Sequence, residues 1–182
     1  MIKLAKHNEL LTQPTNNFDF KNPQMDPKEL ADLLIKNLLH FNGNGVSANQ
    51  IGLPYRVFVL NTDPKFVCFN PIITTSSDEL IVLEETCLSH PGIIMKVKRP
   101  KMIRVRFQDP IGNFNVEKFT GISARVYQQQ HDLIDGITFF KRANRYHKEA
   151  AIKKWTKDKN YGIIDIIRET QMKLLNETKE TI

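Results

Sequence analysis

Cysteines and long apolar runs are both scarce in this sequence. Only two of the 182 residues are cysteines, Cys68 and Cys87, and no stretch approaches the roughly 18–20 consecutive apolar residues that a membrane span needs. The first residues, MIKLAKHNELL, contain too short an apolar stretch for an export signal. These absences predict a soluble cytoplasmic protein without membrane contact, whose thiols stay reduced rather than forming a disulfide.

Internal repeats and low-complexity linkers are also missing. Hydrophobic residues make up 41% of the chain, which at this length is enough for one domain with a substantial core. We therefore predict a single domain over residues 1–182. Residues 1–25 are polar and contain two prolines, which indicates an N-terminal arm. Residues 141–182 should form a basic segment and a C-terminal helix from about Ile163 to Leu175.

Positive charge is concentrated in one segment. Residues 141–159 contain eight basic and two acidic residues, a surplus of six positive charges. The net charge of the whole chain is also +6, so this segment accounts for the entire excess. Such a run can be a solvated face, or it can contact a polyanion such as structured RNA, and both interpretations stay open. A second basic stretch, Lys96–Arg106, is balanced by acidic residues elsewhere.

The first half of the chain shows one helix followed by strands. Asp26 can cap a helix that begins at Pro27, Glu29 completes a capping-box pattern, and Asn42–Gly45 ends it. Short β-branched or aromatic runs then alternate with Asp-Pro, Ser-Ser-Asp, Pro-Gly and Gly-Asn turns. These predicted strands are Arg56–Leu60, Phe66–Ile73, Glu79–Leu83, Met102–Phe107 and Asn113–Phe119.

A second helix is predicted from Gly121 to a stop at Gly136. Four of its residues recur at helical spacing, namely Ile122, Val126, Gln129 and Leu133. With one helix before the strands and another after them, the fold class should be α+β. We expect mixed or antiparallel strands to pack around this central helix, with further helices near both ends.

Three segments carry candidate chemistry, although each is weak alone. GNGVSANQIGLP (Gly43–Pro54) is glycine-rich but lacks the Gly-Lys-Ser/Thr of a phosphate loop. EETCLSHPG (Glu84–Gly92) contains Cys87, and a lone buried cysteine is usually a small hydrophobe. ARVYQQQHDLIDG (Ala124–Gly136) would by itself be an amphipathic core helix.

In this order and at these distances the segments resemble the three motifs of the peptide deformylases. The family motif G-x-G-L-A-A-x-Q corresponds to Gly43–Gln50, and E-G-C-L-S corresponds to Glu85–Ser89. The third, Q-H-E-x-D-H-L-x-G, aligns without a gap to Gln128–Gly136. The resemblance extends over roughly Asp26–Phe140 and implies a peptide-deformylase-like fold.

The resemblance also implies a reaction, the removal of the N-formyl group from formylmethionyl peptides. In that family Fe(II) or Zn(II) is held by the cysteine of the second motif and both histidines of the third, and it activates a water. The glutamate beside the first histidine transfers the proton. The glutamine of the first motif and the backbone N–H after the cysteine stabilise the oxyanion.

Carried over residue by residue, this site is incomplete. Of the metal-ligand positions, Cys87 is retained, but Gln129 and Leu133 replace the two histidines. Leucine has no donor atom, and a neutral glutamine amide is a weak ligand beside a thiolate. Gln130 replaces the glutamate and is not basic near neutral pH. We therefore expect no metal cofactor and an inactive or strongly impaired protein.

Other parts of the site match the family. The oxyanion positions hold Gln50 and Leu88, the latter supplying the backbone N–H. The residues expected to line a pocket for a methionine side chain are Gly45, Val46, Ile122 and Val126. The resemblance therefore predicts a binding or regulatory homologue that recognises formylmethionyl peptide N-termini, and it suggests ribosome or RNA contact through residues 141–159.

Two alternatives keep the protein an active hydrolase. His131 and Asp135 are spaced i, i+4 and could join Cys87 in an unusual metal site, although this requires a helix rotation of about 200°. Alternatively, Cys87 could act as a nucleophile with His90 as its base.

Overall fold

A central helix and two antiparallel sheets define the architecture, which a computed structural model describes for residue 4 and residues 9–157. The α-helices are α1 (Pro27–His40), α2 (Gly121–Ile134), α3 (Phe139–Arg142) and α4 (Arg145–Lys157). Two short 3-10 helices are η1 (Glu9–Leu11) and η2 (Ala48–Ile51). The strands are β1 (Gly45–Ser47), β2 (Val57–Leu60), β3 (Phe66–Ser76), β4 (Leu80–Cys87), β5 (His90–Pro100), β6 (Met102–Gln108) and β7 (Phe114–Thr120).

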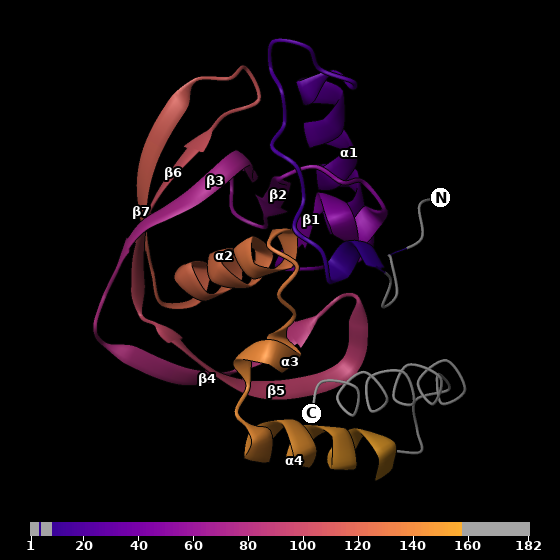
Figure 1. Ribbon diagram of the computed structural model, residues 1–182, viewed down its shortest axis with the longest axis vertical. Helices are drawn as coiled ribbons and strands as arrows, with labels where there is room; N and C mark the ends of the chain where they lie inside the picture. The colour runs from indigo at the N-terminus through magenta and orange to yellow at the C-terminus, as the bar shows by residue number, and fades with distance from the viewer. Residues whose placement is uncertain (1–3, 5–8, 158–182) are drawn as a thin grey trace.

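The strands form a five-stranded sheet in the order β1-β2-β3-β6-β7 and a separate β4–β5 ribbon. All neighbouring strands pair antiparallel. Helix α2 lies between the larger sheet and the ribbon, and α4 runs along β5 (Figure 1). This arrangement confirms the predicted α+β class with a central motif-bearing helix.

Three apolar clusters hold these elements together. The first joins α1 to β1 and β2 through leucines such as Leu34 and Leu38. The second packs α2 against β2, β3 and β6, with Tyr127 fully buried at its centre. The third lies between α2, β5 and α3, and α4 covers it with Ala151, Ile152 and Trp155. Helix α2 therefore contributes to two clusters, so its position and rotation are fixed from both sides.

The predicted helix boundaries are confirmed. Helix α1 begins at Pro27, and the Asp26 carboxylate accepts hydrogen bonds from the backbone N–H groups of Lys28 and Glu29 at 2.8 and 3.1 Å. Helix α2 ends one residue before Asp135, and Gly136 follows with φ of 70°. The N-terminal arm crosses this end, where the Thr15 backbone N–H donates to the Ile134 carbonyl at 2.8 Å.

Strand β5 differs from the prediction, which placed a turn at Pro91-Gly92. The turn instead lies at Leu88-Ser89, because Cys87 pairs with His90 across the ribbon. A proline is tolerated in β5 because this strand pairs with β4 alone in the described sheets, which leaves its other edge without a partner strand. Gly92 adopts φ of 81°, a conformation that glycine accepts without strain.

The basic segment also contains structure that was not predicted. Residues 141–157 belong to α3, its connection to α4, and α4 itself, which is amphipathic although its cations dominate the sequence pattern. The helix predicted at Ile163–Leu175 lies outside the described residues. Within the described residues, no helix is both long enough and apolar enough to span a membrane.

Candidate functional site

The three motif segments meet around one cleft of about 400 Å³. Strand β1 and the loop before it form one wall, the β4–β5 ribbon forms the second, and one face of α2 forms the third. The lining comprises Asn42–Gly45, Glu84–Leu88, Pro91, Gly92, Ile122, Arg125, Val126 and Gln129. The gapless alignment of the third motif therefore corresponds to an actual juxtaposition of all three motifs.

Three of the four predicted pocket residues line this cleft: Gly45, Ile122 and Val126. The prediction for Val46 is wrong, because this side chain is fully buried in the cluster beneath α1. Successive residues of a strand point to opposite faces, so Gly45 can border the cleft only if Val46 points away from it. Leu88 lines the cleft as well.

Gln50 lies beside Cys87, as the family resemblance requires. Its amide nitrogen donates to the Ser89 hydroxyl at 3.0 Å and lies 3.7 Å from the Cys87 sulfur. Its amide oxygen accepts from the Ser47 backbone N–H at 3.1 Å, which closes a capping box at η2. Gln50 is therefore held from both ends, and its amide group is already engaged within the protein.

Gln129 uses its amide to connect α2 to β4. The amide nitrogen donates to a carboxylate oxygen of Glu85 and to the Thr86 carbonyl, both at 3.0 Å. The side chain thus faces Cys87 and its neighbours from across the cleft, as predicted for this position. Its amide nitrogen is thus held by protein oxygens, and the amide oxygen that is left is a neutral, weak ligand beside a thiolate.

Leu133 is the second substituted ligand position, and it is only 1% exposed. Its side chain belongs to the same apolar cluster as Cys87, together with Leu11, Ile93 and Met95. The Leu133 backbone carbonyl accepts a 2.6 Å hydrogen bond from the Asn49 amide, which ties this turn of α2 to η2. Hydrocarbon therefore occupies the position from which a histidine would present its ring.

Gln130 lies behind the β1 wall. The side chain is 2% exposed, and its amide oxygen has no hydrogen-bond partner among the described residues. A Cβ atom at Gly45 would come within 2.9 Å of the Gln130 Cγ, so the glycine is needed for this close approach. A glutamine at this position can donate and accept hydrogen bonds but cannot take up a proton near neutral pH.

The residues present do not fit the metal that the fold family implies. Within the part of the chain that the structure describes, no three His, Cys, Asp or Glu side chains converge to hold an ion. The alternative set of Cys87, His131 and Asp135 is therefore wrong. His131 instead binds Asp135 at 3.1 Å, and both side chains contact Arg56. None of these three residues lines the cleft.

The second alternative, a Cys87 nucleophile, is opposed by the environment of the thiol. Burial raises the pKa of Cys87 to about 11, although backbone N–H groups of Ser89 and His90 partly oppose this shift. A nucleophilic cysteine requires a lowered pKa. His90 is the residue paired with Cys87 across the ribbon, but its ring packs against Phe139 and Phe140. The arrangement favours a neutral thiol.

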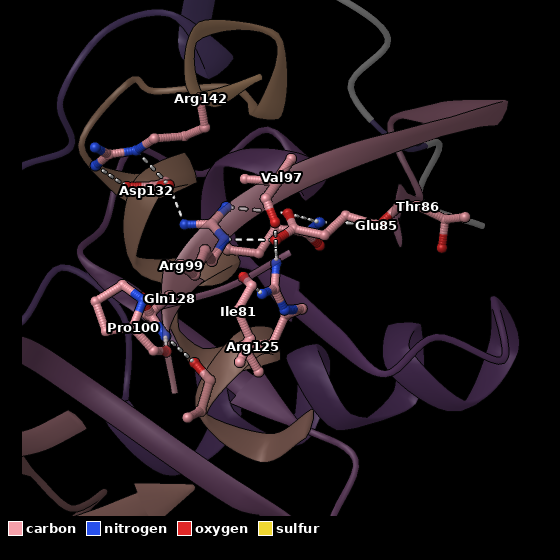
Figure 2. A network of polar contacts seen from close by, with 12 residues as sticks. Ile81, Glu85, Thr86, Val97, Arg99, Pro100, Arg125, Gln128, Asp132 and Arg142 are labelled. Carbon is pink, nitrogen blue, oxygen red and sulfur yellow. Dashed lines mark hydrogen bonds and ion pairs between the residues drawn. The ribbon is translucent and has the colours of Figure 1, made fainter. Parts of the chain in front are cut away.

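A largely buried ionic network borders the cleft, which two of its members, Glu85 and Arg125, line (Figure 2). Arg125 donates to Glu85 at 2.8 Å and to the carbonyls of Val97 and Ile81. Arg99 also binds Glu85, and its other nitrogen reaches Asp132 at 2.6 Å. Arg142 then closes the network from α3 through Asp132. These contacts give Arg125 a structural role in addition to its place on the cleft wall.

Sequence reasoning missed Arg99 and Arg142, because both occur in basic stretches that resemble solvated surface. Arg99 is only 4% exposed and belongs to β5. The acids that hold these arginines were visible as matches to the family motifs, since Glu85 opens the second motif and Asp132 is the retained aspartate of the third. Retained buried acids were thus a signal that cations paired with them should be sought.

Comparison with known proteins agrees with this geometry. The fold matches the crystal structure of a peptide deformylase from Synechococcus elongatus in complex with actinonin, with a TM-score of 0.77, 26% identity, and coverage of 84% of this chain and 85% of that one. The fold is thus α+β and peptide-deformylase-like. The polypeptide deformylase family profile matches residues 2–149, and the chain belongs to that family.

Curated relatives give the same result. A protein of Agrobacterium fabrum named peptide deformylase-like is 36% identical over 135 residues, which cover 73% of this chain and 82% of that protein. The peptide deformylase of Thermotoga neapolitana is 34% identical over 116 residues, covering 63% of this chain and 71% of that enzyme.

Proposed function

We propose that this protein is a non-catalytic deformylase homologue that binds formylmethionyl peptide N-termini in its cleft without hydrolysing them. The observation that carries the proposal is the state of the two substituted ligand positions. Gln129 binds Glu85 and Thr86 through its amide nitrogen and offers only a neutral amide oxygen, and Leu133 is packed in hydrocarbon with Cys87. Catalytic metal sites normally need about three protein ligands, and one thiol does not replace them.

The cleft itself supports binding. Its walls keep apolar side chains suited to a methionine side chain, contributed by Leu88, Ile122 and Val126. Ile122 is 65% exposed, so a ligand there would cover apolar surface that is otherwise solvated. Among the described sheets, β1 is an edge strand of the larger sheet and β4 pairs only with β5, so each has an edge to which an extended peptide could add.

The first experiment measures metal content, turnover and binding on one preparation. We expect no stoichiometric iron or zinc and no measurable deformylation of a formyl-Met peptide. Calorimetry should detect binding of that peptide. A matched peptide that starts with norleucine in place of methionine controls for the size of the side chain. A metal-loaded, active wild type would refute the non-catalytic proposal, and absence of peptide binding would refute the binding role.

Restoring the substituted positions tests the same proposal in reverse. Gln129→His with Leu133→His should recover metal binding but little turnover, and adding Gln130→Glu should then permit turnover, because only this change supplies a base. Leu133→His alone should mainly destabilise by placing an unpaired polar ring in an apolar cluster. Activity in the double variant as high as in the triple variant would contradict the role assigned to position 130.

We extend this proposal to contact with the ribosome, where nascent chains emerge. Lys153, Lys154 and Lys157 are exposed on α4, whose apolar residues Ile152 and Trp155 face the protein. If these cations contact ribosomal RNA, Lys153→Glu with Lys154→Glu should weaken cosedimentation with ribosomes, and added salt should weaken wild-type association steeply. Unchanged association would leave α4 as a solvated face.

A further inference from the structure

The outer face of the larger sheet gathers cations and apolar side chains that nothing in the cleft uses. Helix α2 packs against the inner face, while β3, β6 and β7 present the opposite side to solvent (Figure 1). The outer-face residues are all exposed, and we define this surface by Ile72, Arg104, Arg106, Phe114, Val116 and Lys118.

Strand register places these residues side by side. Ile72, Arg106 and Val116 form one row across β3, β6 and β7, and Arg104 lies directly opposite Lys118 in the next row. Like charges directly opposite each other across strands are destabilising. Arg104, Arg106 and Lys118 make no ion pair with any described acid, although Glu117 lies nearby.

Three other cations of the Lys96–Arg106 stretch, unlike those of the outer face, have an acidic residue as a direct neighbour. Arg99 is neutralised by Glu85 and Asp132, and Lys101 pairs with Glu79 at 2.9 Å. Lys96 lies opposite Glu84 across the ribbon. Lys96, Lys98, Arg104 and Arg106 make no ion pair with a described acid, and of these only Arg104 lies opposite another cation, Lys118.

Aromatic and apolar groups complete the surface. Phe114 is 70% exposed, and the Arg106 guanidinium lies 5.7 Å from the centre of its ring. Val116 is 54% exposed in the same area and borders a hollow of about 430 Å³ that Arg104 and Lys118 also line. Charges on β7 could serve only to protect the sheet edge from pairing, but Arg104 and Arg106 are on β6, which is already paired on both sides.

We propose that the outer face binds single-stranded RNA. Arg104 and Arg106 are two residues apart along β6, which separates them by about 7 Å, a repeat suited to successive phosphates of an extended strand. Phe114 offers a ring on which a base stacks, and such platforms beside a cationic track bind single strands with little sequence preference. This surface is separate from both the cleft and α4, so the proposal does not depend on the function proposed above.

The test uses fluorescence anisotropy of the full chain with a fluorescein-labelled oligouridylate. Arg104→Gln with Arg106→Gln should weaken binding at least tenfold and lower the slope of log K against log salt by about 1.4, because two phosphate contacts are lost. Phe114→Ala should weaken binding about tenfold through lost stacking. Lys96→Gln with Lys98→Gln removes equal charge from β5 and should change affinity less than about twofold.

Each contrary outcome overturns the proposal. Absence of oligouridylate binding excludes it, and loss of binding only in Lys153→Glu with Lys154→Glu places the RNA contact on α4. Polyglutamate that competes as well as RNA, with no effect of Phe114→Ala, would assign the outer face to an acidic protein instead. Thermal unfolding of each variant checks that these exposed substitutions leave the fold intact.

Discussion

At the scale of single residues, Gln129 and Leu133 occupy the positions of the two family histidines, and each fits its surroundings in a different way. Gln129 forms a cross-link, since its amide satisfies oxygens of Glu85 and Thr86. Leu133 forms no polar side-chain contact and adds to the cluster that contains Cys87. The two positions are therefore stabilised by different interactions, one by hydrogen bonds and the other by apolar burial.

Asp135 provides a pH-dependent contribution to stability. Burial alone would raise the pKa of this carboxyl, but hydrogen bonds from His131 and Arg56 outweigh burial and lower the pKa to about 2. Because the unfolded value is near 3.9, the stabilisation is fully present above about pH 4 and is lost as the pH falls through about 2. Asp135→Asn should lower the free energy of unfolding at pH 7 by about 1–2 kcal/mol after allowance for solvent screening.

Urea unfolding at pH 7 and pH 2 measures this effect. The difference between wild type and Asp135→Asn should shrink to a small fraction at the lower pH, because the carboxyl is then about half protonated in the folded state and almost fully protonated in the unfolded state. An equal difference at both pH values would show that packing rather than the carboxylate charge is responsible.

The sequence predicts which residues form the site better than it predicts which residues bind them. The third motif aligns without a gap, and this fixed the register that brings Gln129 and Leu133 towards Cys87. Arg99 could not be foreseen from its own stretch of sequence, because its neighbours in KVKRP alternate between exposed and buried positions only once β5 exists. Burial of a cation depends on acids distant in sequence, which local pattern does not report.

At the scale of elements, the chain shows where local signals mislead and where they suffice. Helix α1 has a capping aspartate and α2 has a glycine stop, both of which act within a few residues, and both helices were predicted. Strand β5 contains Pro91-Gly92, which locally resembles a turn, and only its pairing with β4 decides the matter. Helix α4 was hidden by its cations, since the apolar residues that seat it are few.

Gly136 is the strongest of these local stops. A Cβ atom there would lie 2.7 Å from backbone atoms of both Thr12 and Gln13, and the residue also has φ of 70°. Gly136→Ala should therefore combine backbone strain with displacement of the N-terminal arm and lower the free energy of unfolding by about 2–4 kcal/mol.

Gly52→Ala is the matched control for this substitution. Gly52 has φ of 86°, but a Cβ atom there would meet nothing within 4 Å, so strain alone should cost about 1 kcal/mol. Chemical denaturation compares the two variants directly. Equal destabilisation would mean that contact with the arm contributes nothing.

At the scale of the whole molecule, the buried ionic network joins elements that are far apart in sequence. Glu85 on β4, Arg99 on β5 and Asp132 on α2 form a continuous chain of contacts, which Arg142 extends to α3. Helix α2, the ribbon and the start of the basic segment are thus held by the same charges (Figure 2).

Removing the central cation should therefore affect the entire fold. Arg99→Ala leaves Glu85 and Asp132 buried with fewer partners and should lower the free energy of unfolding by about 3–5 kcal/mol. Lys101→Ala removes an ion pair two residues away whose members are 51% and 61% exposed, and should change it by less than about 1 kcal/mol. Similar values for the two variants in urea titrations would show that burial does not distinguish these pairs.

Trp155 connects α4 to the rim of the cleft. Its indole N–H donates to the Pro91 carbonyl at 3.3 Å, and the ring nitrogen lies 3.2 Å from where a Gly92 Cβ would be. Both rim residues line the cleft, and the chain contains no other tryptophan. The fluorescence of this single indole depends on the solvent around it at the rim. Occupancy of the cleft can therefore be followed by intrinsic tryptophan fluorescence, without a label.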